Sequence, residues 1–86
     1  MPRFKFNLFT GSEVISDPEG SEMPNLEAAT RKAIGDCRTF ASNELRAGRP
    51  FPVWAAMEIC DENGRVRHIE WVKDLIPTAA THIPTE

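Results

Sequence analysis

The sequence predicts a small α+β domain with the element order ββαββ, in which one long helix packs on one face of a four-stranded antiparallel sheet. Three observations predict this class: apolar and polar residues alternate over 3–10, an apolar stripe at helical period covers 26–45, and a hairpin turn occupies 61–64. Short connections and antiparallel pairing then favour the spatial strand order 2-1-3-4. This order places the first strand centrally, under the helix, and leaves the other face of the sheet open.

The first hairpin is predicted from residues 3–10 and 13–16. Three apolar side chains share one face of its first strand and are predicted core residues: Phe4, Phe6 and Leu8. The segment 17–22 combines carboxylates with Pro and Gly. We therefore expect a solvated polar loop there, held by a contact from the Asp17 side chain to the backbone.

One long helix is predicted to begin after Asn25 and to end at Gly48. The Asn25 side chain can accept a hydrogen bond from the first turn, and Gly48 can adopt the left-handed conformation that ends a helix. The core-facing stripe consists of mainly small apolar residues: Leu26, Ala29, Ala33, Cys37, Phe40 and Ala41. Glu44 falls in the middle of this stripe, so its charge must reach a partner, and Arg3 or Arg49 is the expected one.

The second hairpin is predicted from residues 53–60 and 65–72, joined by a turn in which Gly64 adopts positive φ. The last strand has a mixed pattern, because Val66 lies on one parity and the later apolar residues lie on the other. A bulge near Arg67–His68 would reconcile the two halves.

The size of the chain defines a single domain and excludes several function classes. With 86 residues, the chain is near the lower end of the usual domain range. We assign residues 1–75 to the domain and 76–86, with two prolines, to a loosely attached tail. The chain is too short for a large enclosed cofactor cavity. It contains no phosphate loop, Cys-x-x-Cys pair or nucleophile elbow, so we expect no cofactor, metal site or catalytic residue.

The compartment is inferred from the first thirty positions, where charged residues are spread through the chain and no apolar signal-peptide core occurs. A cytoplasmic protein that neither enters nor binds a membrane is therefore expected. Cys37 and Cys60 are expected to be reduced thiols in such a compartment.

Several motifs resemble a family of short bacterial proteins, common in alphaproteobacteria, that is classed as a domain of unknown function. The order and spacing of the motifs carry the resemblance: Met1–Phe6, Asp17–Gly20, Glu22–Ala29, the helix end Glu44–Pro50, and Ile59–Val66 with its Asp61–Gly64 turn. The resemblance covers about residues 1–75 and supports the ββαββ outline. It implies no activity and no functional residue.

Two groups of side chains are candidates for interaction. The first is a row of basic residues expected on the outer face of the helix: Arg31, Lys32, Arg38 and Arg46. Such a row would suit phosphate or an acidic partner. The net charge of -3 opposes generic nucleic-acid binding, and no aromatic residue lies among these charges to stack on a base. The alternative is an ordinary solvated helix face.

The second group is Trp54 and Trp71. If Trp54 alternates outwards from its neighbours, it lies on the open sheet face, where it could form a self-interface with Phe9. The alternative is a side chain folded under the loops or the tail.

We therefore predict a non-catalytic protein-interaction or regulatory module. Its partner would be an unknown protein or a second copy, bound through the open sheet face or an exposed edge strand. One alternative is a non-specific nucleic-acid-binding module that uses the basic helix face. A further alternative is a small enzyme or ligand binder with a site between subunits, which a deep pocket holding His68 and a carboxylate would favour.

Overall fold

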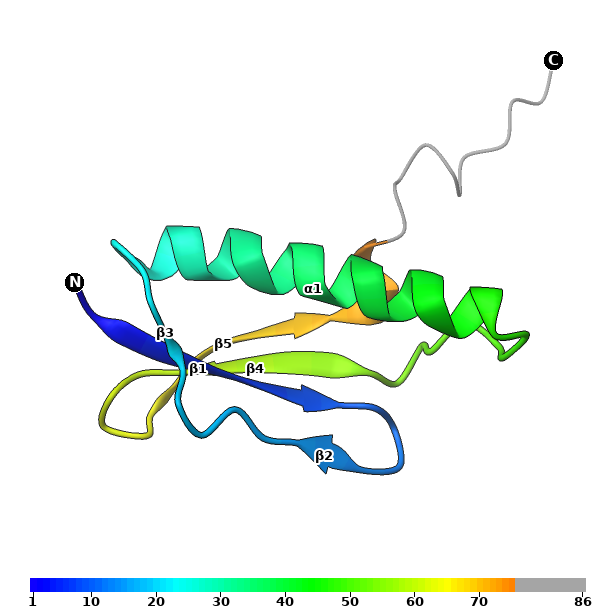
Figure 1. Ribbon diagram of the computed structural model, residues 1–86, viewed down its shortest axis with the longest axis horizontal. Helices are drawn as coiled ribbons and strands as arrows, with labels where there is room; N and C mark the ends of the chain where they lie inside the picture. Colours follow the sequence, from blue (N-terminus) through cyan, green and yellow to red (C-terminus); the bar gives the residue numbers. More distant parts are fainter. Residues whose placement is uncertain (76–86) are drawn as a thin grey trace, which may run out of the picture.

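The computed structural model describes residues 1–75, so the predicted tail over 76–86 lies outside the described residues. It has the predicted α+β architecture, with α1 lying across one face of the sheet (Figure 1). The elements follow one another as β1 (Arg3–Phe9), β2 (Val14–Ile15), β3 (Ser21–Glu22), α1 (Leu26–Arg46), β4 (Ala56–Cys60), β5 (Val66–Trp71) and the 3-10 helix η1 (Val72–Leu75).

The sheet has the order β2-β1-β4-β5, and every pair in it is antiparallel. The predicted order 2-1-3-4 is therefore confirmed. Its centre is the long ladder between β1 and β4, in which Lys5 pairs with Cys60 and Phe9 pairs with Ala56.

The core combines small residues on α1 with large ones on the sheet and at the start of η1. The fully buried side chains of α1 are Ala29, Ala33, Cys37 and Ala41. Because these side chains are short, α1 can lie close to the sheet, and the bulk of the core comes from Phe4, Phe6, Met57, Ile59 and Val72. The predicted core residues Leu8, Leu26 and Phe40 are partly buried and pack against this cluster.

Both helix ends are formed by the predicted residues. Asn25 Oδ1 accepts from the backbone N–H of Ala28 at 2.8 Å. At the other end Gly48 has φ +81°, and the N–H groups of Gly48 and Arg49 donate to the carbonyls of Leu45 and Glu44. This pair of bonds is a Schellman motif, which satisfies carbonyls that the last turn leaves unpaired.

Glu44 belongs to the same helix end. Its two carboxylate oxygens accept from Arg49 Nε and Nη2 at 2.8 and 2.9 Å, and this contact lowers the pKa of Glu44. Arg49, one of the two partners predicted for Glu44, is therefore the observed partner. The other candidate, Arg3, instead contacts Glu22 at 3.3 Å.

The outer side of β1 carries a strand that the sequence did not predict. The expected polar loop contains β3, which pairs with β1 at Arg3 and Phe4. Between β2 and β3, Asp17 Oδ2 accepts from the N–H of Phe6 at 3.1 Å, and its other oxygen accepts from the N–H of Gly20 at 3.1 Å. The predicted side-chain contact from Asp17 is thus confirmed, and it continues the hydrogen bonding of β1 where no strand is present.

The boundaries of two predicted strands were wrong. The second strand is only Val14–Ile15, and β4 begins at Ala56 and not at residue 53. Residues 53 and 54 form a turn, in which the N–H of Val53 donates to the carbonyl of Phe51. The N–H of Ala55 likewise donates to the carbonyl of Pro52 at 3.1 Å, so these two residues use their N–H groups within the turn and not in a ladder.

Candidate protein-interaction surface

Strand β5 contains the bulge that its sequence pattern predicted. Opposite Ile59 and Cys60 the register shifts, so that Ile59 pairs with His68 whereas Cys60 pairs with Val66. Arg67 is the extra residue. The bulge therefore brings Val66 onto the same face as the later apolar residues of the strand.

Three apolar side chains of β5 lie together on the sheet face that α1 does not cover. They pair with Ala56, Glu58 and Cys60 of β4, whereas the alternate residues Met57 and Ile59 point into the core under the helix. The three are Val66, Ile69 and Trp71, with exposed fractions of 49%, 42% and 39%. We call them the β5 surface.

The β5 surface continues into an apolar row that crosses the whole sheet. The register aligns Trp71, Ala56, Phe9 and Val14 on the open face, one from each of four neighbouring strands. Ala56 is only 2% exposed although α1 lies on the other face of the sheet, because larger neighbours in the row enclose it. The rest of the face is polar, with Asn7 Nδ2 donating to Glu58 Oε1 at 3.4 Å.

Trp54 does not lie in the sheet, so its predicted place as an alternating strand residue was wrong. It is 73% exposed and lies in the turn before β4. It does lie near Phe9, because both line a hollow of about 270 Å³ with Val14 and the turn at Gly11. Trp54 thus borders the open face without belonging to it.

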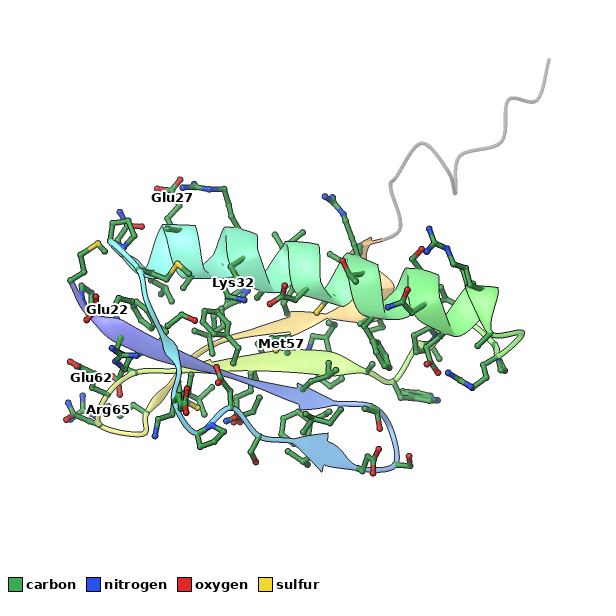
Figure 2. All side chains as sticks on the ribbon, viewed as in Figure 1. Glu22, Glu27, Lys32, Met57, Glu62 and Arg65 are labelled. Carbon is green, nitrogen blue, oxygen red and sulfur yellow. The ribbon has the colours of Figure 1, made fainter. Side chains whose placement is uncertain are left out.

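The basic face of the helix is partly neutralised. Arg31 contacts Glu27 at 3.5 Å, one turn away. Lys32 points from α1 towards the sheet, as Figure 2 shows, whereas Glu27 points away from it. Lys32 contacts Asp36 at 2.7 Å and lies 4.9 Å from the centre of the Phe6 ring, so its predicted place on the outer face was wrong. Arg38 and Arg46 are exposed on α1.

A hollow of about 430 Å³ lies at the start of α1, where Arg3 and Arg67 reach its wall. Both guanidinium groups have carboxylate partners: Arg3 contacts Glu22 at 3.3 Å, and Arg67 contacts Asp61, which also lines the hollow, at 3.6 Å. The charges of this hollow are therefore balanced. It does not extend a positive surface from the helix to β5.

His68 and Glu70 lie on the helix side of β5, with His68 Nε2 2.9 Å from Glu70 Oε1. The nearby thiol of Cys37 lies 4.0 Å from the carbonyl oxygen of Glu70. Burial, reinforced by the charges of Glu70 and Asp36, raises the pKa of Cys37 to about 11. Cys37 is thus a protonated core thiol at neutral pH and not an activated nucleophile.

Cys60 is also a buried thiol, on the opposite face of the sheet from Cys37. Its sulfur lies 3.4 Å from Glu58 Oε1, and burial together with this carboxylate raises its pKa. Within residues 1–75, no group of three His, Cys, Asp or Glu side chains could hold a metal ion.

No helix in the described part of the chain is long and apolar enough to cross a membrane.

The structure therefore does not bring the predicted candidate residues together in one site. The structure brings Trp71 into the β5 surface, and it places Trp54 beside the open face. The sequence did not single out Val66 and Ile69 as interaction residues. The bulge was the available signal, because a shifted parity puts Val66 in line with Ile69 and Trp71.

Comparison with known proteins places the chain in a family but gives it no role. No curated protein and no solved structure matches it. A family model described as a domain of unknown function, DUF6894, matches residues 3–70, which span β1 to β5. The chain therefore belongs to the DUF6894 family.

Proposed function

We propose that this chain is a non-catalytic protein-interaction module that binds its partner on β5. One observation carries the proposal: β5 exposes three apolar side chains on the open face, and within residues 1–75 no other strand pairs with its outer side. Apolar side chains beside unpaired backbone groups are the features that strand-addition sites combine, since the backbone supplies affinity and the side chains supply selectivity.

The other two classes have less support in the geometry. A nucleic-acid-binding helix needs a continuous positive track, but two of the four predicted basic residues, Arg31 and Lys32, contact carboxylates. An enzyme of the Cys–His type needs a thiolate, but burial keeps Cys37 protonated. Neither class is therefore proposed here.

The proposal is tested by cross-linking in living cells with a photoreactive amino acid at position 66, on the β5 surface. The matched control carries the same amino acid at Thr39, which is exposed on α1. We expect cross-links to protein, either this chain or another, from position 66 and fewer from position 39. Cross-links to nucleic acid, or equal protein yields from both positions, would contradict the proposal.

A further inference from the structure

The outward-pointing backbone groups of β5 can be identified from its pairing with β4. The N–H of Val72 donates to the carbonyl of Ala55 at 3.0 Å. In an antiparallel ladder, successive residues of one strand point their backbone N–H and C=O groups alternately towards and away from the partner strand. Glu70 and His68 therefore point their backbone groups towards β4, whereas Ile69 and Trp71 point theirs away from the sheet. The outer side of β5 thus offers N–H and C=O groups at two successive outward positions.

From this edge we infer that the partner on β5 is a second copy of this chain, added in antiparallel fashion so that two sheets become one. The inference rests on the proposed function and names its partner. A two-fold axis perpendicular to the sheet relates such copies, and residues at equal distances from the axis then face each other. Both helices remain on one face, and the two β5 surfaces meet on the other.

The charges of the facing side chains favour one register between the two β5 strands. With the axis beside Ile69, His68 of each copy faces Glu70 of the other, so two pairs of complementary groups form. An axis beside Glu70 would instead place two carboxylates directly opposite each other, which is unfavourable in a sheet. An axis beside His68 would place two imidazoles opposite each other. A neutral imidazole N–H can donate to a carboxylate, so the favoured register does not require a protonated ring.

The register with the axis beside Ile69 also suits the outward backbone groups of β5 and the side chains on its open face. The two copies of Ile69 form the central hydrogen-bonded pair, because its N–H and C=O point outwards. Their side chains, each 42% exposed in the single chain, then lie against each other. One strand pair buries less than the roughly 800 Å² per partner of a standard stable interface. We therefore expect a reversible dimer at high protein concentration.

The first test combines sedimentation with amide hydrogen exchange on the purified full chain. We expect the mass to approach two chains as concentration rises, and the amides of Ile69 and Trp71 to become protected over the same range. Ile69→Lys should weaken dimerisation at least about tenfold, because two lysines would then face each other. Val14→Lys is the control, since Val14 is exposed on the same face but at the far side of the sheet; it should leave dimerisation unchanged.

A charge exchange tests the register itself. His68→Glu should dimerise poorly because it places two carboxylates opposite each other, and Glu70→Lys should dimerise poorly because it removes the carboxylate that accepts from His68. Mixing the two variants should restore association, since one facing pair then joins a carboxylate to an ammonium group and the other keeps His68 opposite Glu70. Circular dichroism of each variant checks that the fold is intact.

The results separate this inference from the proposed function. A single-chain mass at all concentrations, a dimer lost with Val14→Lys and kept with Ile69→Lys, or no recovery on mixing two folded variants would overturn the self-pairing. If position 66 still cross-links to a different protein in cells, the proposed function stands and only the identity of the partner was wrong. If position 66 cross-links to no protein, the proposed function fails as well.

Discussion

The outer side of β1 is covered along its length, whereas the outer side of β5 is bare within residues 1–75. On β1, β3 pairs at one end, β2 pairs at the other, and the carboxylate of Asp17 accepts from the N–H of Phe6 between them. On β5 the sheet ends, and the bond from Val72 to Ala55 implies that the backbone groups of Ile69 and Trp71 point outwards. Within residues 1–75, the segment 14–22 thus covers one edge of the sheet and no segment covers the other.

A small domain must either protect the unpaired edges of its sheet or use them for association. Natural proteins cover or charge sheet edges because unpaired strands associate with other chains. The segment 14–22 provides this protection for β1 with two short strands, β2 and β3, and the side chain of Asp17. The exposed apolar residues of β5 have no such cover among the described residues, and this asymmetry is the basis of the proposed function.

The largest expected effect comes from opening the covered edge at Gly20. Gly20 has φ +71°, and a Cβ atom there would lie 2.6 Å from the carbonyl oxygen of Phe4. Gly20→Ala should therefore lower the free energy of unfolding by about 3 kcal/mol, from left-handed strain and displacement of β3. Urea unfolding measures this loss. Gly64→Ala is the control, because Gly64 has φ +83° but, apart from its two chain neighbours, no atom of residues 1–75 would lie within 4 Å of its added Cβ, and it should cost only about 1 kcal/mol. Equal losses would show that the close approach of β3 to β1 is unimportant.

A smaller effect is expected at Asp17. Asp17→Ala removes the acceptor for the N–H groups of Phe6 and Gly20, and it should cost about 2 kcal/mol. Asp17→Asn keeps one acceptor oxygen and should cost less. Urea unfolding gives the free energies, and amide exchange at Phe6 should accelerate more in the Ala variant. A neutral result for Asp17→Ala would mean that water replaces the carboxylate at this edge.

The two thiols report on the sheet between these edges. Cys37 lies under α1 near β5, and at pH 7 a pKa of about 11 leaves roughly one thiolate in ten thousand. Labelling of Cys37 by a thiol reagent should therefore be more than about tenfold slower in the native state than in urea. Cys60, also buried and with a raised pKa, should behave in the same way. Fast native labelling of Cys37 alone would show that α1 opens from the β5 side.

Much of the fold could be predicted from the sequence, because local signals specify it. The caps at Asn25 and Gly48, the turn at Gly64 and the alternation of Phe4 and Phe6 each depend on neighbours close in the chain. Strand β3 was missed because two polar residues carry no periodic signal, and only their proximity to β1 makes them a strand. Trp54 was assigned to the wrong element for a related reason: the alternating apolar pattern predicts a strand at residues 53 and 54, where the structure has a turn.

The candidate surface was less predictable, because it depends on which side chains remain uncovered after packing. Lys32 shows the difficulty: its helical position suggested solvent, but Phe6 and Asp36 hold it against the sheet. Trp71 was identified as a candidate. The contribution of Ile69 required the observed register, which places it opposite Glu58 on the open face.

The smallest expected effect on stability lies at the bare edge, and it separates stability from association. Ile69 is partly exposed, and among residues 1–75 no element covers it on the open face, so Ile69→Lys should change the free energy of unfolding by less than about 0.5 kcal/mol. Urea unfolding must be measured at low micromolar concentration, because dimerisation would add apparent stability to the parent chain. At high concentration the parent should gain stability relative to Ile69→Lys, since only the parent pairs along β5. A large loss at low concentration would mean that Ile69 supports the monomer fold, and the contrast between a covered and a bare edge would then no longer hold. A small loss at low concentration that grows as the chain is concentrated is the result expected of a strand edge kept open for a partner.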